Sequence, residues 1–128
     1  KGDDGVYWPG MFIDFYSKDG KGATKKDHDY GAIRIRADQR GGEFTGKVIN
    51  VTGWWTLGMS VTPDGQVHYY AKSGVEDLTA EDFITSQFPY GKQALQFQTF
   101  FFNVCNSDDD QTWSTEFIID DPRMYLAR

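Results

Sequence analysis

Residues 54–72 read WWTLGMSVTPDGQVHYYAK, and this stretch predicts a β-hairpin. Apolar side chains recur at every second position of both arms, which is the period of a β-strand. The connection Pro63-Asp64-Gly65 suits a tight turn, because proline presets the first turn dihedral and glycine accepts the left-handed conformation. The predicted inner face of the hairpin carries Trp55, Leu57, Met59, Val61, Val67, Tyr69 and Ala71.

Two more strands are predicted upstream of the hairpin, in residues 6–16 and 30–37. The first reads VYWPGMFIDFY and the second reads YGAIRIRA, and both alternate with a period of two. The first strand places Met11, Ile13 and Phe15 on one face. The second directs Ile33 and Ile35 inward and Arg34 and Arg36 outward. The polar, glycine-containing segment between them is predicted to be a loop.

Downstream of the hairpin, LTAEDFITS at 78–86 predicts a helix of about two turns. Thr79 can cap its first amides, and Asp82 stands at the reciprocal position of a capping box. Two long strands follow, at 95–104 and 114–126, and the first of them ends in a fully apolar run typical of a central strand.

The composition favours two packed sheets. The chain has 128 residues, with 4 Trp, 7 Tyr and 10 Phe, and each buried aromatic ring removes roughly 150–250 Å² from water. We therefore expect an all-β, two-sheet antiparallel β-sandwich (a jelly roll) with one short helix, formed by a single domain over residues 1–128. The single Cys105 excludes an internal disulfide.

The charge pattern excludes several classes of partner. The formal net charge is −6 and no basic stripe is present, so a nucleic-acid backbone would be repelled and no nucleic acid is expected as a partner. No apolar stretch approaches the roughly 20 residues of a membrane-spanning helix, so no membrane insertion is expected.

The stretch GWWTLGMSVTPDGQVHYYAKSG at 53–74 resembles a hairpin of the concanavalin A-like lectin/glucanase jelly roll, a superfamily that includes laminin-G-like modules. In that hairpin a Trp opens the strand, a D-G turn follows, and the return strand carries a Tyr. The segment TEFIIDDPRMYLA at 115–127 is similar to the closing strand of the superfamily. The resemblance implies one of four activities: sugar binding, polysaccharide hydrolysis, polysaccharide elimination or protein adhesion.

The motifs of the enzymes in that superfamily are incomplete here. Retaining glycosidases need two carboxylates about 5–5.5 Å apart, and the strand motif E-x-D-x-x-E that supplies them in the glucanases does not occur. The alginate lyases carry Q-[IV]-H, a Tyr-rich segment and an Arg-rich strand. This pattern is matched in part by Gln66-Val67-His68, the adjoining Tyr70 and the arginines of 30–37. In such a site Arg would neutralise the carboxylate of a uronate, while His and Tyr exchange the proton on the neighbouring carbon.

The residues also suggest a binding site. Sugars are held by aromatic faces and by polar hydrogen-bonding groups, and the aromatic residues exceed what two inner faces need. The preferred interpretation is a non-catalytic carbohydrate-binding module of a secreted or cell-surface protein, one domain of a longer chain, with a polysaccharide or glycan as partner. The candidate binding residues are Arg34, Arg36, Trp54, His68, Tyr70, Tyr90 and Trp113.

Three questions stay open on the sequence alone. A polysaccharide lyase or glycoside hydrolase with an atypical site is the first alternative, and a protein-adhesion module is the second. No organic cofactor is indicated, whereas a structural calcium ion is left open, because Asp108-Asp109-Asp110 and Asp120-Asp121 offer the oxygen ligands that calcium prefers.

Overall fold

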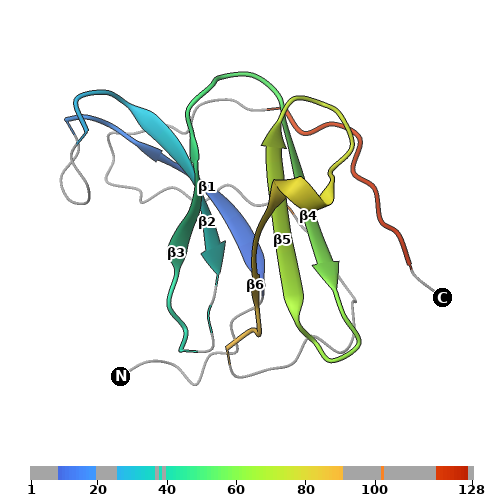
Figure 1. The fold of residues 1–128 in the computed structure, drawn as a ribbon. Helices are drawn as coiled ribbons and strands as arrows, with labels where there is room; N and C mark the ends of the chain where they lie inside the picture. The colour runs from blue at the N-terminus through green and yellow to red at the C-terminus, as the bar shows by residue number, and fades with distance from the viewer. Residues whose placement is uncertain are drawn as a thin grey trace. The chain divides into compact units, whose positions relative to one another are not determined.

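The computed structural model describes residues 9–19, 26–36, 38, 40–90, 102 and 118–126. The chain divides into two units, Lys1–Phe97 and Gln98–Arg128, and all the described strands belong to the first (Figure 1). The predicted strand at 95–104, apart from Phe102, and Cys105 lie outside the described residues.

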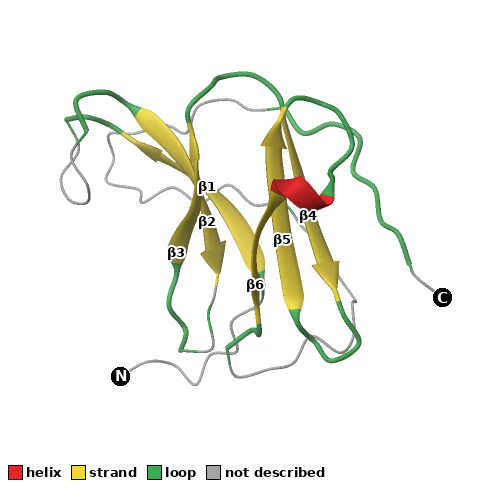
Figure 2. Cartoon of the chain, in the orientation of Figure 1, coloured by secondary structure: helices red, strands yellow, loops and turns green. Residues whose placement is uncertain are grey.

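The described part of the chain is almost entirely β-structure (Figure 2). Strands β1, β2 and β3 form the first sheet in the order β1-β2-β3, and β4, β5 and β6 form the second in the order β4-β5-β6. All four pairings are antiparallel, which confirms the predicted two-sheet sandwich. The strands are β1 (Gly10–Tyr16), β2 (Tyr30–Arg36), β3 (Phe44–Ile49), β4 (Trp55–Val61), β5 (Val67–Ser73) and β6 (Phe83–Gln87).

The predicted hairpin is confirmed as β4 and β5, which pair from Trp55 with Ser73 to Val61 with Val67. Gly65 takes the left-handed conformation, with φ 85°. Its backbone N–H donates to the carbonyl of Thr62 at 2.8 Å. The Asp64 carboxylate accepts the Thr62 hydroxyl and the Gln66 amide, and these bonds lower the pKa of Asp64.

The predicted two-turn helix over 78–86 is wrong in extent. A single 3-10 turn, η1 (Ala80–Asp82), is present, and the following residues form β6. Asp82 does fulfil its expected capping role, because its carboxylate accepts the Thr79 backbone N–H at 2.7 Å and the Thr79 hydroxyl at 3.0 Å. Beyond Asp82 the β-branched pair Ile84-Thr85 fits a pleated strand better than a helix, and pairing with β5 decides the outcome.

Strand β3 was not predicted from the sequence, because Gly46 interrupts its alternation. The ladder between β2 and β3 shifts register at Ile33/Arg34, where β3 has the extra residue of a bulge. At Gly46 the two sheets come very close. A Cβ on this residue would lie 2.7 Å from Ile84 Cγ2 and 2.9 Å from Ile35 Cγ1. Glycine is therefore required where β3 meets β6.

The core lies between the two central strands, β2 and β5. Ile33 and Ile35 from β2 pack with Val67, Tyr69 and Ala71 from β5, and all five are buried. Partly buried side chains surround this cluster, from Met11, Phe44, Ile49, Trp55, Met59, Val61 and Ile84.

Hydrogen bonds between described residues also join the sheets. The Tyr69 hydroxyl donates to the Arg36 carbonyl at 3.0 Å, and Lys47 Nζ donates to the Ala71 carbonyl at 2.6 Å. They connect β5 to β2 and to β3, and so fix how the two sheets face each other.

Two predicted apolar segments are more exposed than a core segment would be. Ile13 and Phe15 share the inner face of β1 with Met11 but are 44% and 69% exposed. The predicted last strand is wrong over 118–126, which has no strand pairing and holds Tyr125 81% exposed. The physical reason is local: Asp121 has φ 49°, and the proline that follows it has no N–H for a ladder.

Substituting Gly46→Ala should destabilise the sandwich. The added methyl overlaps branched carbons of two packed isoleucines, and overpacking of this kind costs about 1–3 kcal/mol. Urea unfolding followed by tryptophan fluorescence measures the change. Gly10→Ala is the matched control, because its Cβ would meet only the Phe12 ring at 3.8 Å. Equal stability of the two variants would contradict the close approach of β3 and β6.

Substituting Tyr69→Phe should lower stability at pH 7 by about 1 kcal/mol, the usual net contribution of a hydrogen bond. Burial raises the pKa of Tyr69 from 10.0 to about 12. The raised pKa contributes stability that is complete below pH 10 and is lost as the pH rises through about 12. The two proteins should therefore converge in unfolding free energy between these pH values, and parallel pH profiles would refute this role.

Candidate functional site

The structure separates the predicted binding residues into different surfaces. Arg34 and Arg36 alternate with the buried isoleucines of β2, so they lie on the outer face of the first sheet. His68 and Tyr70 alternate with buried residues of β5 and lie on the outer face of the second sheet. The arginines therefore do not lie on a strand beside the hairpin, because β2 belongs to the other sheet.

The arginines of β2 are paired with carboxylates of this chain. Arg34 donates to Asp14 at 3.0 Å and to Glu43 at 3.1 Å, and Arg36 Nε donates to Glu43 at 2.6 Å. The Arg36 guanidinium also lies 4.7 Å from the centre of the Phe12 ring. The hydrogen bond to Asp14 raises the pKa of Arg34. We call this connected row the arginine ladder.

The arginine ladder continues into a pair of tyrosines that the sequence analysis did not single out. Tyr16 and Tyr30 are cross-strand partners whose rings stack at 4.8 Å, with Lys26 Nζ 4.0 Å from the centre of the Tyr30 ring. The Tyr16 hydroxyl donates to Asp14 at 3.1 Å. Their positions in the sequence could have predicted this contact. The two tyrosines flank the predicted loop, and an antiparallel hairpin brings the residues at the two ends of its loop together.

The outer face of the second sheet is partly covered. The Leu78 side chain lies where a Cβ on Gly58 would stand, so the connection between β5 and η1 covers part of this face. The Phe83 ring meets Tyr70 edge-on at 5.6 Å and lies 6.4 Å from His68. Trp54, just before β4, is 49% exposed. Tyr70 and His68 therefore pack under Phe83 and do not form an open aromatic platform.

No hydrogen bond joins His68 to an acid or base in the part of the chain that the structure describes. Its register neighbours are Ser60 on β4 and Ser86 on β6, and its Nε2 atom is buried without a hydrogen bond. The arginines that a uronate lyase would need beside His68 are those of the ladder, on the opposite sheet. The described residues therefore do not assemble the lyase constellation suggested by the sequence.

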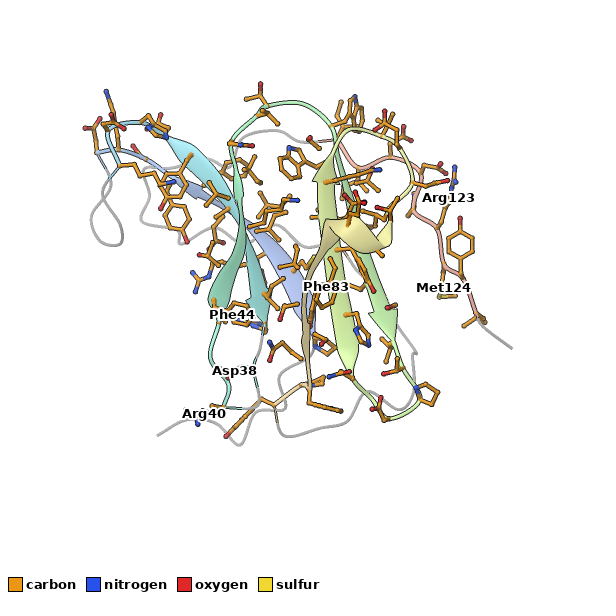
Figure 3. All side chains as sticks on the ribbon, in the orientation of Figure 1. Asp38, Arg40, Phe44, Phe83, Arg123 and Met124 are labelled. Atoms are coloured by element: carbon orange, nitrogen blue, oxygen red, sulfur yellow. The ribbon has the colours of Figure 1, made fainter. Side chains whose placement is uncertain are left out.

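A different site lies at one end of the first unit, where the β2–β3 loop meets the end of β6. Asp38, Arg40, Ser86, Gln87 and Phe88 line an open hollow of about 360 Å³. Figure 3 shows Asp38 and Arg40 on the loop between β2 and β3, near the end of β6. We call this site the loop-end hollow.

Local hydrogen bonds hold the loop that carries this site. Asp38 Oδ1 accepts the backbone N–H groups of Arg40 and Gly42, each at 2.8 Å. The Asp38 N–H donates to the Gly42 carbonyl at 3.0 Å, and Gly41 turns the chain with φ 79°. The bonds from Gly42 and Arg40 lower the pKa of Asp38 below its usual value of 3.8. Asp38 is therefore a fixed carboxylate at neutral pH.

Tyr90 is the predicted binding residue that the structure brings to this loop. Its ring lies beside Gly41, where a Cβ would be 3.5 Å from Tyr90 Cγ, and the residue is 38% exposed. In the sequence, Tyr90 stands in the segment QFPYGK at 87–92. Asp38 and Arg40 were missed, since nothing local indicates that their loop meets β6.

The remaining site predictions concern ions and the C-terminal unit. The described residues contain no group of three or more side chains suited to a metal ion. Asp121 is paired with Arg123, and Asp27 with His28. Trp113 and Asp108-Asp109-Asp110 lie outside the described residues, so the calcium prediction there stays a prediction.

Comparison with known proteins finds no match to a family model, to a curated protein or to a solved structure. Among the described residues, no helix is long and apolar enough to cross a bilayer. The chemistry of the site is therefore the basis for assigning a function.

Substituting His68→Leu should leave the free energy of unfolding unchanged or raise it by up to about 1 kcal/mol. The change removes a buried nitrogen that has no hydrogen bond and keeps the packing volume under Phe83. Denaturant unfolding measures it, with His68→Gln as the control that retains a polar group. Destabilisation by His68→Leu alone would show that Nε2 has a partner and reopen a functional role for this histidine.

Proposed function

We propose that this chain is a non-catalytic carbohydrate-binding module of the concanavalin A-like jelly-roll type, belonging to a secreted or cell-surface protein. The observation that carries the proposal is the loop-end hollow. Its lining brings a carboxylate, a guanidinium, a hydroxyl, an amide and one aromatic ring, that of Phe88, around a volume of about 360 Å³. Ligand sites typically span about 300–1,000 Å³, so the hollow suits one sugar unit of a longer glycan.

The groups of the hollow match what a sugar offers. Each sugar hydroxyl both donates and accepts hydrogen bonds, and Asp38 accepts, Arg40 donates, and Ser86 and Gln87 can do both. The C–H faces of a pyranose ring are apolar and stack on aromatic rings, which Phe88 supplies in the hollow and Tyr90 beside the adjoining loop. This combination of groups favours a glycan over a purely apolar ligand.

Binding is proposed in preference to cleavage because of the carboxylates. Glycoside hydrolysis uses a pair of carboxylates, and the described residues that line the hollow include one, Asp38. That carboxylate already accepts two backbone N–H groups, which keep it ionised and unsuited to act as a general acid near neutral pH.

Affinity electrophoresis through gels that contain soluble polysaccharides tests the proposal. At least one glycan should retard the protein. Tyr90→Ala should lower the affinity for that glycan about tenfold, which is roughly 1.4 kcal/mol of binding free energy, because it removes an aromatic ring on which the sugar can stack. Trp54→Ala is the matched control: it removes an exposed ring from another surface and should bind like the wild type.

Two outcomes would overturn the proposal. If no polysaccharide retards the folded protein, sugar binding is rejected and the protein-adhesion alternative gains. If Trp54→Ala abolishes retardation while Tyr90→Ala does not, the glycan binds beside the hairpin and not at the loop-end hollow. Circular dichroism of each variant excludes unfolding as the cause.

A further inference from the structure

We infer that the loop-end hollow selects uncharged sugars that present neighbouring hydroxyl groups, and that it rejects uronate and sulfated glycans. The inference rests on the proposed function and names the class of glycan. It follows from the fixed carboxylate of Asp38, from the presence of Arg40 in the same lining, and from the location of Arg34 and Arg36.

The first step concerns the fixed carboxylate. Asp38 is held in place by the N–H groups of Arg40 and Gly42, and it lines the hollow. A uronate carboxylate or a sulfate in this space would face a like charge that cannot move away without breaking both bonds. Like charges at close range repel each other, so the hollow disfavours anionic sugars.

The second step concerns the charge balance inside the hollow. Arg40 stands two residues after Asp38, and among the described residues of the lining it supplies the one cationic side chain. The negative charge of Asp38 and the positive charge of Arg40 offset each other, so an anion gains no net attraction from these two side chains. The lining therefore offers an acceptor from Asp38 and a set of donors from Arg40, which suits two neighbouring hydroxyls, where one donates and the other accepts.

The third step concerns the cations that an anionic glycan would need. Arg34 and Arg36 lie on the outer face of the first sheet, where Asp14 and Glu43 already pair with them. They cannot serve the loop-end hollow without breaking the arginine ladder. The chain carries a net charge of −6, so its long-range field also repels a polyanion at low salt.

The test compares two charge classes of polysaccharide in one assay. The wild type and the variants Asp38→Asn and Glu81→Gln are run through gels that contain an uncharged glucan, an uncharged galactan or polygalacturonate. The mobility of each protein is compared with its mobility in a gel without polysaccharide. Glu81 is exposed and lies on η1, so Glu81→Gln removes one negative charge away from the lining of the hollow.

The wild type should bind an uncharged polymer and not polygalacturonate. Asp38→Asn keeps an oxygen for the two N–H groups but removes the charge, so its affinity for polygalacturonate should rise at least about fivefold, while Glu81→Gln should change nothing. Wild-type binding to polygalacturonate in preference to both uncharged polymers overturns the inference and leaves sugar binding standing. Absence of binding to every polymer rejects the proposed function, and the inference with it.

If Asp38→Asn does not fold, a second variant, Arg40→Ala, tests the inference. Arg40→Ala leaves the backbone bonds to Asp38 intact and gives the hollow a net negative charge. It should lose affinity for the uncharged polymer at least about fivefold and gain none for polygalacturonate. Unchanged binding in Arg40→Ala would overturn the inferred part of Arg40 in selecting the sugar.

Discussion

The packing of β2 against β5 determines the rest of this structure. Ile33 and Ile35 meet Val67, Tyr69 and Ala71, and the Tyr69 hydroxyl reaches across to the Arg36 carbonyl. Apolar burial supplies most of the stabilisation, whereas the hydrogen bond fixes the position of one sheet relative to the other. Because side chains alternate along a strand, this one contact also decides which residues of both central strands face solvent.

One consequence is that the two outer faces cannot share a ligand site. The arginines of β2 and the His68–Tyr70 pair of β5 point away from the core in opposite directions, since each alternates with buried residues. Residues from both sheets can meet only where loops pass the ends or edges of the sandwich. The loop-end hollow is such a place, and the close approach of Gly46 to Ile84 holds β3 and β6 together near it.

The sequence predicted what depends on local pattern. Strict alternation and the Pro63-Asp64-Gly65 turn defined β4 and β5, and the Ile-Arg-Ile-Arg repeat defined β2 with its correct outward face. It failed for β3, where Gly46 breaks the pattern, and for β6, where pairing with β5 overrides a helix-capping signal. Most of the candidate site was missed for the same reason, because only the packed sheets bring Asp38 and Arg40 to Ser86 and Gln87.

The arginine ladder and the loop-end hollow use charge in opposite ways. In the ladder, Asp14 and Glu43 satisfy both arginines, whose side chains are about a third exposed, so the row adds little to stability. A face whose charges are already paired also has little binding energy to offer a ligand. In the hollow, the Asp38 carboxylate is positioned by backbone N–H groups, and Arg40 belongs to the same lining. Because those bonds form without any ligand, a sugar that binds there would not have to order the carboxylate first.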